Sequence, residues 1–518
     1  MADQWFGFGG DDTTGLGTLA SPWLTYEKAA TESLSGDICW MVDGEIEADA
    51  TVNYMRINSN RIVKAVNYRA AVQLADAGYT TMCGRWESTA AANNPYLVDG
   101  ITFDAKNTVN WGFAQQQDAA EDIITQLHNV HVKDAVVYGF VCYTLRGRQE
   151  LVNTKASGRP SVGGFVFSDS SSGDGNQVID MQGCEIDITG TGTGIQGVKA
   201  QKVNNLTNTM EVYIKGLSGT ISGTGGSEEI DGAIRVVGVA SPTITNSNII
   251  LNAVNAASNH FGISVSGLSI AITSSPTITN NTLKFNSPSG YGIALGESVT
   301  DANVTGGLMA GNKVTGKYYA SNTPHNFLIG QGVTGEVRGN TSIDGYIGYL
   351  ISKTTNADVI GNTAFDCYGS SYYIKGATDC TVRDNTAVCS GKFTQRDIGV
   401  LSVVVQGAVN TASATIQENL IIVADISKIH SLAQIGDINQ VCTFVRNTYI
   451  IPDTVDVATE QLFSYQSATP NNTLAQWNAQ TEITNDIIVP MPAAAIAALI
   501  EDYRPVTGGG SSGLIIGI

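Results

Sequence analysis

Short runs in which apolar residues alternate with polar or small ones recur along the chain, and this pattern predicts β-strands. Clear examples lie at 262–265, 292–295, 326–329, 348–351 and 372–375. The runs are rich in Val, Ile and Tyr, which favour strands over helices. Because alternate strand residues point to opposite faces, we expect one set of apolar residues to form the core. This set consists of Ile263, Val265, Ile293, Leu295, Phe327 and Ile329.

An asparagine-containing turn recurs between these strands. The sequence Ser-Pro-Thr-Ile-Thr-Asn occurs at 241–246 and again at 275–280, and later turns carry an asparagine after Gly, Asp, Glu or Arg. Counted from Asn248, the turn asparagines follow one another at intervals of 22 to 34 residues. They are Asn248, Asn281, Asn312, Asn340, Asn362, Asn385, Asn419 and Asn447. Such a period with variable insertions is typical of a solenoid, in which each coil buries its apolar side against the next.

This repeat resembles the right-handed parallel β-helix of the pectate-lyase-like superfamily. In that family, the turn asparagine pairs through its amide with asparagines of adjacent coils. Asparagine tolerates left-handed backbone angles, and stacked amides would be about 4.8 Å apart. We therefore expect an all-β fold, a single-stranded right-handed parallel β-helix with a short N-terminal capping helix and a C-terminal cap. The turn asparagines then have a structural role.

The resemblance extends over nearly the whole chain and predicts four regions. They are a tail at 1–13 that is available for docking, an N-terminal cap at 14–44, the β-helix at 45–450, and a C-terminal cap with a closing segment at 451–518. In the N-terminal cap, Ser21 is a favourable N-cap and Pro22 a favourable first residue of a helix. An Ala-rich run at 491–500 predicts a second helix in the closing segment.

Composition and charge narrow the choice of partners. The chain has 518 residues with 57 Gly and 28 Lys plus Arg, and its formal net charge is −19. Few charges and many glycines suit a turn-rich all-β solenoid. The negative charge argues against a nucleic acid partner, whose phosphates would be repelled. It also argues weakly against an anionic glycan held by general electrostatics, although a local basic patch would overcome this.

The eight cysteines and the first residues point to a reducing compartment. No Cys-x-x-Cys pair exists, which argues against a zinc site or a redox motif. We expect the cysteines to be small buried apolar residues. The N-terminal sequence has no basic region followed by an apolar core, and no run approaches the roughly 18 apolar residues of a membrane span. We therefore expect synthesis in a cytosol and no membrane insertion.

Two lysines are the candidate catalytic residues. The segment at 351–353 followed by Gly-Asn-Thr at 361–363 resembles the base position of polysaccharide lyase family six, so the resemblance implies that Lys353 is a base. That family places an arginine one coil later, where this chain has Lys375. The acidic residues that hold calcium in the family correspond here to Tyr346 and Tyr349. Calcium is therefore expected only if the protein is a lyase, and otherwise no cofactor is expected.

Carboxylates are a second source of chemistry, because glycoside hydrolysis needs two of them at a set separation. Glu150, Asp187 and Glu297 are among the acidic residues, but nothing in the sequence pairs them. The sequence leaves a solvated charged surface as the alternative interpretation.

Aromatic residues are the candidate glycan-binding residues, because aromatic rings stack on the apolar faces of sugars. Trp86, Tyr96 and Trp111 lie in the N-terminal part, and Tyr372 belongs to a tyrosine-rich region further along. The alternative is that the tyrosines form a core stack and a subunit contact.

Two functions remain open. The first is a virion structural protein, a bacteriophage tailspike or tail-fibre-like appendage for host attachment that binds host-surface polysaccharide. It would be made in the host cytoplasm, contact other virion proteins and form a homotrimer, with Trp5, Phe6 and Phe8 covered in the assembly. The second is a polysaccharide lyase or glycoside hydrolase of the same fold, secreted by a non-classical route. We favour the first, by analogy of fold and composition.

Overall fold

The computed structural model of the chain forms two compact units, unit 1 at residues 1–255 and unit 2 at residues 256–518. The structure describes residues 3–34, 36–47, 54–57, 62–75, 81–87, 96–116, 123–143, 147–168, 176–190, 192–202, 209–223, 230–256, 259–267, 273–296, 304–320, 323–330, 332–394, 398–404, 413–436, 441–466 and 470–505.

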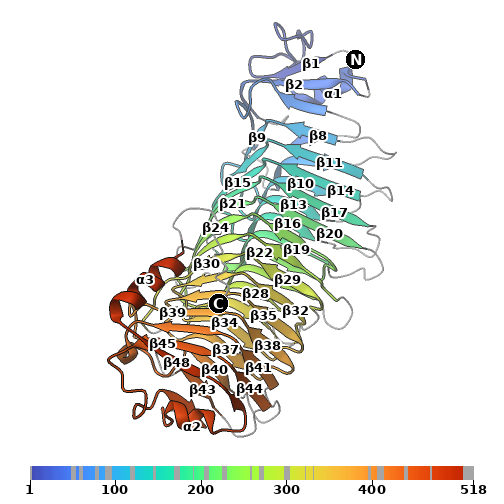
Figure 1. Ribbon diagram of the computed structural model, residues 1–518. Coiled ribbons are helices and arrows are strands. Elements are labelled where there is room, and N and C mark those ends of the chain that lie inside the picture. The colour runs from blue at the N-terminus through green and yellow to red at the C-terminus, as the bar shows by residue number, and fades with distance from the viewer. Residues whose placement is uncertain are drawn as a thin grey trace. The chain divides into compact units, whose positions relative to one another are not determined.

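Unit 1 is a parallel β-helix whose strands form three sheets, I, II and III, visited in that order by each coil (Figure 1). Sheet I contains β1 (Gln4–Gly7), β2 (Ile38–Val42), β5 (Ile62–Ala65), β8 (Tyr96–Asp99), β11 (Ile123–His128), β14 (Gly147–Val152), β17 (Gln177–Gln182), β20 (Met210–Lys215) and β23 (Thr243–Thr245). Sheet II contains β3 (Gly44–Glu47), β6 (Ala71–Leu74), β9 (Thr102–Asp104), β12 (His131–Lys133), β15 (Lys155–Gly158), β18 (Glu185–Gly190), β21 (Ser218–Gly223) and β24 (Asn248–Asn252). Sheet III contains β4 (Met55–Ile57), β7 (Met82–Glu87), β10 (Trp111–Gln116), β13 (Tyr138–Tyr143), β16 (Gly163–Ser168), β19 (Ile195–Gln201) and β22 (Ile230–Val237).

Unit 2 has the same three-sheet arrangement. Its sheet I contains β26 (Thr277–Thr279), β29 (Gly307–Ala310), β32 (Gly335–Arg338), β35 (Ala357–Ile360), β38 (Cys380–Arg383), β41 (Ser413–Gln417), β44 (Val441–Val445) and β47 (Ile483–Thr484). Its sheet II contains β27 (Thr282–Asn286), β30 (Lys313–Thr315), β33 (Thr341–Ile343), β36 (Thr363–Phe365), β39 (Thr386–Cys389), β42 (Leu420–Val423), β45 (Thr448–Pro452) and β48 (Ile487–Met491). Its sheet III contains β25 (His260–Ser266), β28 (Gly290–Leu295), β31 (His325–Ile329), β34 (Ile347–Ser352), β37 (Ser370–Lys375), β40 (Leu401–Val404), β43 (Ala433–Ile435) and β46 (Phe463–Tyr465). The predicted all-β parallel β-helix is confirmed.

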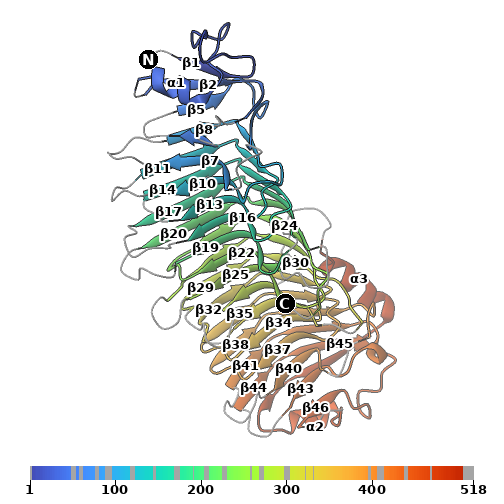
Figure 2. The same cartoon turned by 180° about the vertical axis from the view of Figure 1, so that it is seen from behind.

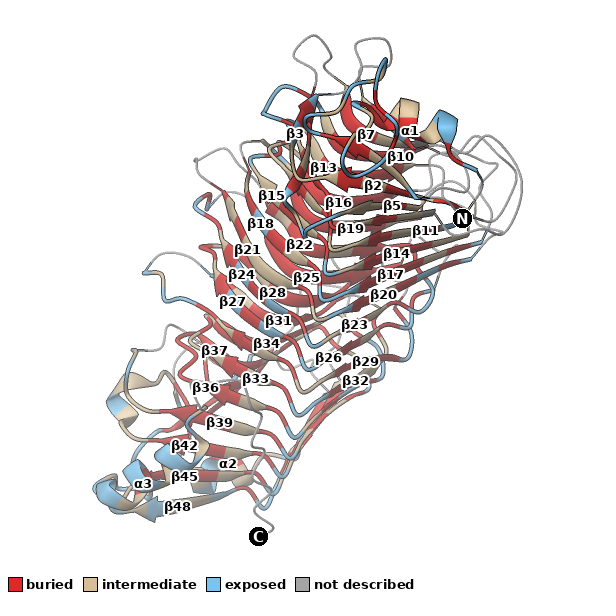
Figure 3. Cartoon of the chain, turned by 90° about the horizontal axis from the view of Figure 1, so that it is seen from above, coloured by how far each residue is buried: buried red, intermediate tan, exposed pale blue. Residues whose placement is uncertain are grey.

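The predicted core is also confirmed. Ile263, Val265, Ile293, Leu295, Phe327 and Ile329 are all fully buried. Buried residues alternate with less buried ones along many strands, as Figure 3 shows. The alternation that identified the strands therefore also separated the inner residues from the outer ones.

A residue with a left-handed backbone begins the turn between sheets I and II in coil after coil. In unit 1 these residues include Gly100, Asn129, Asn153, Gly183, Gly216 and Asn246, and in unit 2 they include Asn280, Gly311, Gly339, Gly361, Asp384, Glu418, Arg446 and Asn485. Asparagine, aspartate and glycine dominate because they tolerate positive φ. The residue that follows each of them is buried.

In unit 2 that buried residue is an asparagine in every turn but the last, where it is Asp486, and the asparagines form a hydrogen-bonded ladder. The side-chain amide of Asn281 donates to Oδ1 of Asn312 across 2.9 Å, and Asn312 donates in the same way to Asn340. The ladder continues through Asn362, Asn385, Asn419 and Asn447. The predicted pairing of stacked amides is confirmed for these residues.

The prediction for Asn248 is wrong. Asn248 is exposed, because Ser247 occupies the buried position that follows the left-handed Asn246. The two Ser-Pro-Thr-Ile-Thr-Asn segments therefore align Ser247 with Asn281. The other buried turn positions of unit 1 carry Ile101, Val130, Thr154, Cys184 and Leu217, so its described turns hold no buried asparagine ladder.

The N-terminal capping helix is present but begins later than predicted. Helix α1 (Tyr26–Glu32) follows Thr25, whose hydroxyl accepts a hydrogen bond from the backbone N–H of Lys28. Thr25 is therefore the N-cap, and the assignment of Ser21 and Pro22 to the helix start is wrong.

The first aromatic residues belong to the fold. Because β1 pairs in parallel with β2, Trp5 stacks on Trp40 and Phe6 is buried against Tyr26 of α1. The expectation that Phe6 needs a partner chain to cover it is therefore wrong, whereas Trp5 remains partly exposed. Phe8 is exposed.

Two helices close the described C-terminal part. Trp477 of α2 (Leu474–Asn478) is buried against Phe463 and Phe444, so α2 packs on the last strands of sheets I and III. Helix α3 (Ala493–Tyr503) begins two residues later than the predicted Ala-rich helix at 491–500 and extends beyond it, and it covers a flank of unit 2. Its Ile496 and Ile500 pack on an outward row of sheet II, which consists of Phe365, Val388, Ile422 and Ile450.

All eight cysteines are free and buried, as predicted. Desolvation raises the pKa of the Cys184, Cys380 and Cys442 thiols to about 12. None of the helices in the described ranges is long and apolar enough to cross a membrane.

Candidate glycan-binding site

The outer face of sheet III in unit 1 brings aromatic and basic side chains together. Figure 2 shows its strands β7, β10, β13, β16 and β19 one after another. The parallel register aligns one outward-facing residue from each strand into a row that runs along the coils. The row begins with two arginines, continues with three small apolar residues, and ends with a lysine and an arginine. In order, this row is Arg56, Arg85, Ala114, Val141, Val166, Lys199 and Arg235.

Three aromatic rings lie over the apolar middle of the row. Trp111, Tyr138 and Tyr143 pack against the cluster that contains Ala114 and Val141. The ring centroids of Trp111 and Tyr143 are 6.0 Å apart and those of Tyr138 and Tyr143 are 6.3 Å apart, both in edge-on arrangements. Each of the three rings is partly exposed, whereas Val141 is fully buried. We call Trp111, Tyr138 and Tyr143 the aromatic platform.

Polar side chains follow on the next coils. Arg235 forms an ion pair with Asp231, and Gln196 Nε2 donates to the same carboxylate across 2.7 Å. Lys199 precedes Arg235 in the outward row and is partly exposed. The face therefore offers rings that fit the apolar side of a sugar, and charged and amide groups that bind its polar substituents.

The predicted glycan-binding residues divide into three outcomes. Trp111 lies on the aromatic platform. Trp86 and Tyr96 lie in β7 and β8, but their side chains fall outside the described residues. In the register of β7, Trp86 pairs with Gln115 and belongs to the row next to the outward one. Tyr372 lies in β37 of unit 2 and is buried.

The interpretation of Tyr372 as a glycan-binding residue is wrong. Tyr372 is buried inside the coil, with its ring stacked on Tyr349 at a centroid distance of 5.0 Å. Its hydroxyl donates to the backbone oxygen of Asn362 across 2.7 Å, and desolvation raises its pKa well above 10. The alternative interpretation, a stack of tyrosines in the core, is correct for Tyr372. Tyr349 and Phe327 continue the stack.

The candidate lyase residues lie one coil apart. Lys353 has a left-handed backbone with φ of 54°, and its N–H donates to the carbonyl of Lys375 across 3.0 Å. Tyr349 is buried inside the coil, so this position does not offer an outward group for calcium. Lys375 lies near His325, whose pKa falls to about 3 through burial and the lysine charge. Among the described residues, no group of three or more His, Cys, Asp or Glu could hold a metal ion.

The structure brings together two carboxylates, Glu150 and Asp180, whose proximity the sequence did not show. On the outer face of sheet I in unit 1, Arg148 Nη2 lies 2.5 Å from Asp180 Oδ2, and Arg148 Nε lies 3.6 Å from Glu150 Oε2. His128 Nε2 lies 3.1 Å from Glu150 Oε1. Arg148 lies between the two carboxylates and forms ion pairs with both of them. We interpret this cluster as an ion-pair network on the sheet.

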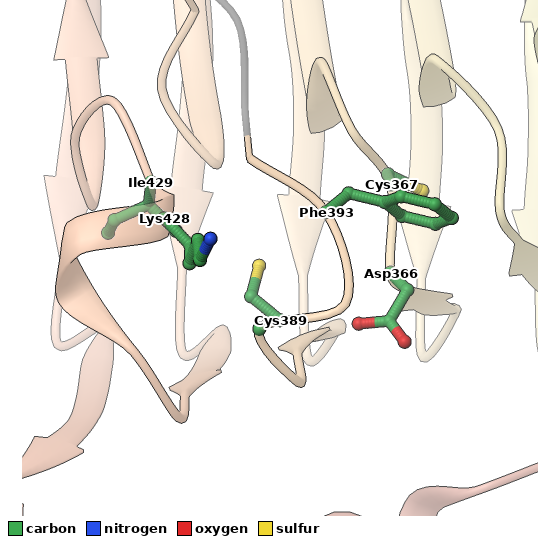
Figure 4. A pocket seen from close by; sticks show the side chains of 7 residues that line it. Asp366, Cys367, Cys389, Phe393, Lys428 and Ile429 are labelled. Carbon is green, nitrogen blue, oxygen red and sulfur yellow. The ribbon is translucent and has the colours of Figure 1, made fainter. Parts of the chain in front are cut away.

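A small hollow that is open to solvent lies in unit 2 (Figure 4). It is lined by Asp366, Cys367, Cys389, Gly391, Phe393, Lys428 and Ile429. Desolvation raises the pKa of the Cys367 thiol to about 12, so this sulfur is a poor nucleophile at neutral pH. Asp366 accepts hydrogen bonds from the backbone N–H and the hydroxyl of Ser390. These hydrogen bonds of Asp366 are those of a turn. We therefore assign the hollow no binding role.

Sequence reasoning found Trp111 but missed Tyr138, Tyr143, Lys199 and Arg235. These residues come together only through the register of β10, β13, β19 and β22. Tyr143 lies two residues after the outward Val141 and is in phase with it, whereas Tyr138 lies three residues before Val141 and is out of phase, so strand alternation alone does not identify Tyr138. The sequence does not align one coil with the next, because the loops between them vary in length.

No family model matches the chain, and no curated protein matches it. Solved structures that are similar to it include the following two. One is the N-terminal fragment of gene product 12 of bacteriophage Phi29, at 11% identity and a TM-score of 0.27, covering 82% of this chain and 86% of that chain. The other is the A-module of the Azotobacter vinelandii mannuronan C-5 epimerase AlgE6, at 10% identity and a TM-score of 0.23, covering 88% and 91%. Likenesses this low carry no argument about function.

Proposed function

We propose that this protein binds polysaccharide through the outer face of sheet III in unit 1, and that it does so as a phage virion appendage of the tailspike or tail-fibre type. The observation that supports binding is the aromatic platform of Trp111, Tyr138 and Tyr143 on one outer face. Partly exposed rings over a flat strand surface present an extended apolar area to successive sugars.

A rigid scaffold favours such a role. Consecutive parallel strands hold the platform residues at about 4.8 Å per coil, so little ordering is required when a glycan binds. The strands lie on a fully buried core that includes Phe113, Phe140 and Phe165 directly beneath the face. A preorganised, elongated face suits attachment to a polymer on a cell surface.

Direct binding measurements test the proposal. We expect Trp111→Ala and Tyr138→Ala each to weaken polysaccharide binding by about tenfold or more in calorimetry or biolayer interferometry, because each removes a stacking surface. The matched control is Tyr68→Ala, since Tyr68 is exposed and lies outside this face. Equal affinity of the platform variants and the wild type for every glycan bound would contradict the proposal.

The virion assignment and the homotrimer belong to the same proposal and rest on the fold and the composition of the chain. Two measurements test them. Mass spectrometry of purified phage particles that encode this chain should detect it as a particle component. Light scattering at micromolar concentration should give the mass of a trimer of the 54.4 kDa chain. Absence of the chain from the particle would contradict the virion assignment, and a monomeric mass would contradict the homotrimer.

A further inference from the structure

We infer that unit 2 carries a second polysaccharide-binding surface, on the outer face of its own sheet III, and that this surface takes uncharged sugars. The inference goes beyond the proposed function, which concerns unit 1 alone. It comes from a backbone feature that both units contain and from the side chains that this feature turns outward.

In unit 1, a glycine near the start of a sheet III strand places two successive residues toward the interior. In β13 these are Gly139 and Phe140. A Cβ atom at Gly139 would lie 3.3 Å from Cβ of Ala156, a fully buried residue of sheet II, and Phe140 is itself buried. Regular alternation is therefore interrupted at this pair. The residues on its two sides, Tyr138 and Val141, both face outward, and this is why Tyr138 can join the aromatic platform.

Unit 2 contains the same feature in β28. A Cβ atom at Gly292 would lie 2.6 Å from Cγ1 of Val314, a fully buried residue of sheet II, and Ile293 is also fully buried. Tyr291 and Ala294 are therefore turned outward, as Tyr138 and Val141 are in β13. The pattern of an aromatic residue, a glycine, a buried apolar residue and an outward residue occurs at 111–114, 138–141, 261–264 and 291–294.

The outward aromatic residues of unit 2 form a row. Phe261 pairs with Tyr291, and Tyr291 pairs with His325, with ring centroids 5.6 and 5.3 Å apart. The ring of Tyr346 continues the row 5.9 Å from His325. We call Phe261, Tyr291, His325, Tyr346 and Tyr373 the unit 2 aromatic surface. These residues pack against an outward apolar row that consists of Ala294, Leu328 and Leu350.

This surface is partly exposed and is made of uncharged side chains. Tyr291, His325, Tyr346 and Tyr373 are each partly exposed. Burial and the charge of Lys375 lower the pKa of His325 to about 3, so its imidazole is neutral at pH 7. From β25 to β37, the two outward rows contain no Asp, Glu, Lys or Arg; they are Phe261, Tyr291, His325, Ile347 and Ser370, and Ser264, Ala294, Leu328, Leu350 and Tyr373.

This lack of charge indicates the class of ligand. The whole chain has 47 Asp plus Glu and a net charge of −19, so uncharged rows on one face contrast with its general composition. Partly exposed rings on a rigid face fit the apolar faces of sugars, and rows without charged groups do not depend on charge in the polymer. We therefore assign the surface to uncharged sugars.

One buried polar atom of the surface is also available to a ligand. Nδ1 of His325 makes no hydrogen bond within the described part of the chain. Buried polar atoms normally have a partner, so an unpaired one is a feature that needs an explanation. His325 lies between the rings of Tyr291 and Tyr346, where the hydroxyl of a stacked sugar would supply the missing hydrogen bond.

The experiment measures binding to dextran, galactomannan and sodium polygalacturonate by biolayer interferometry. We expect Tyr291→Ala to weaken binding to a neutral polymer by about tenfold, both alone and in the Trp111→Ala background, because it removes a stacking surface. Tyr291→Phe is the matched control, since it keeps the ring, and it should retain the affinity. The affinity of Trp111→Ala should not change when NaCl is raised to about 0.5 M, because the rows offer no charge to screen.

Two further measurements keep the test decisive. Circular dichroism shows whether Tyr291→Ala is folded; if it is not, Tyr373→Ala replaces it, since Tyr373 belongs to the same surface in another strand. Light scattering compares the mass of the variant with that of the wild type. A lower mass for the variant would show that the surface is a contact between copies of the chain, and the inference would fail.

The outcomes separate this inference from the proposed function. If Trp111→Ala weakens binding and Tyr291→Ala does not, the site in unit 1 stands and the second surface is absent. If Tyr291→Ala weakens binding and Trp111→Ala has no effect, the second surface stands and the aromatic platform of unit 1 fails. Binding of polygalacturonate alone would overturn the assignment to uncharged sugars, and absence of binding to all three polymers would overturn both proposals.

Discussion

The side-chain amide of Asn447 donates to the carboxylate of Asp486 across 3.0 Å, and this bond ends the buried asparagine ladder of unit 2. Asp486 also accepts from the backbone N–H of Asn447, the hydroxyl of Tyr449 and the indole N–H of Trp477. An aspartate suits the last position because every one of its partners there is a donor. The ladder is thus tied to α2, which carries Trp477.

Removal of this carboxylate should destabilise the fold. Asp486→Ala leaves several buried donors without acceptors, and each costs about 1 to 3 kcal/mol, so we expect a loss of roughly 3 kcal/mol or more. Asp486→Asn keeps one acceptor for Asn447 but turns an N–H₂ toward Trp477, and we expect a smaller loss. Urea unfolding followed by tryptophan fluorescence measures both. Equal stability of the alanine variant and the wild type would show that the hydrogen bonds of Asp486 do not contribute to the free energy of unfolding.

The same residue should make stability depend on pH. Burial raises the pKa of Asp486 above its ordinary value of 3.8, and this outweighs the opposing effect of its donors. The folded state therefore holds the proton more tightly than the unfolded state, so the stability from this group is fully present below pH 3.8 and is lost as the pH rises through the raised pKa. The advantage of the wild type over Asp486→Asn should shrink between pH 3.5 and 7. The pKa of Asp366 is also raised, but Asp366 is present in both proteins, so its effect on the pH dependence of stability cancels in the comparison.

Two asparagines that look alike in sequence should respond differently to mutation. Asn362 accepts from the backbone and side-chain N–H groups of Asn340 and donates to Asn385 and to the carbonyl of Val337. Asn362→Ala should cost roughly 2 to 4 kcal/mol, because buried partners lose their bonds. Asn248→Ala at an exposed position should change stability by less than about 0.5 kcal/mol. Thermal unfolding of both variants provides the comparison, and similar losses would contradict the ladder interpretation.

Tyr372 should matter for stability and not for binding. Tyr372→Phe keeps the ring on Tyr349 but removes the hydroxyl that donates to Asn362, so we expect a loss of about 1 kcal/mol. Its affinity for polysaccharide should equal that of the wild type, in contrast to Trp111→Ala. A tenfold loss of binding in the Tyr372→Phe variant, with unchanged stability, would return Tyr372 to the list of glycan contacts.

Lys353 should not be a catalytic base. It occupies a left-handed turn position, and we expect Lys353→Ala to change stability by less than about 0.5 kcal/mol. On alginate, pectate and chondroitin, we expect no unsaturated uronate product from the wild type or from the variant. Removal of a true base would lower the rate by about a hundredfold to ten-thousandfold. Turnover by the wild type that disappears in Lys353→Ala would establish the lyase instead.

The sequence by itself determined the fold class and the identity of the core. Strand alternation is a local property with a period of two residues, so Ile293 and Leu295 could be assigned to the interior without knowledge of any other coil. Turn chemistry is equally local, since only a few residue types accept positive φ, and it located the ladder asparagines from Asn281 onward.

The tertiary structure alone decided phase and register. A shift of one residue exchanges the inner and outer sets, and this is why Asn248 was placed inside, where Ser247 lies, and Tyr372 was placed outside. Register between coils depends on the loops, whose lengths vary and carry no periodic signal. For this reason the sequence showed Trp111 as an isolated residue, and only the pairing of parallel strands placed it on one face with Tyr138 and Tyr143.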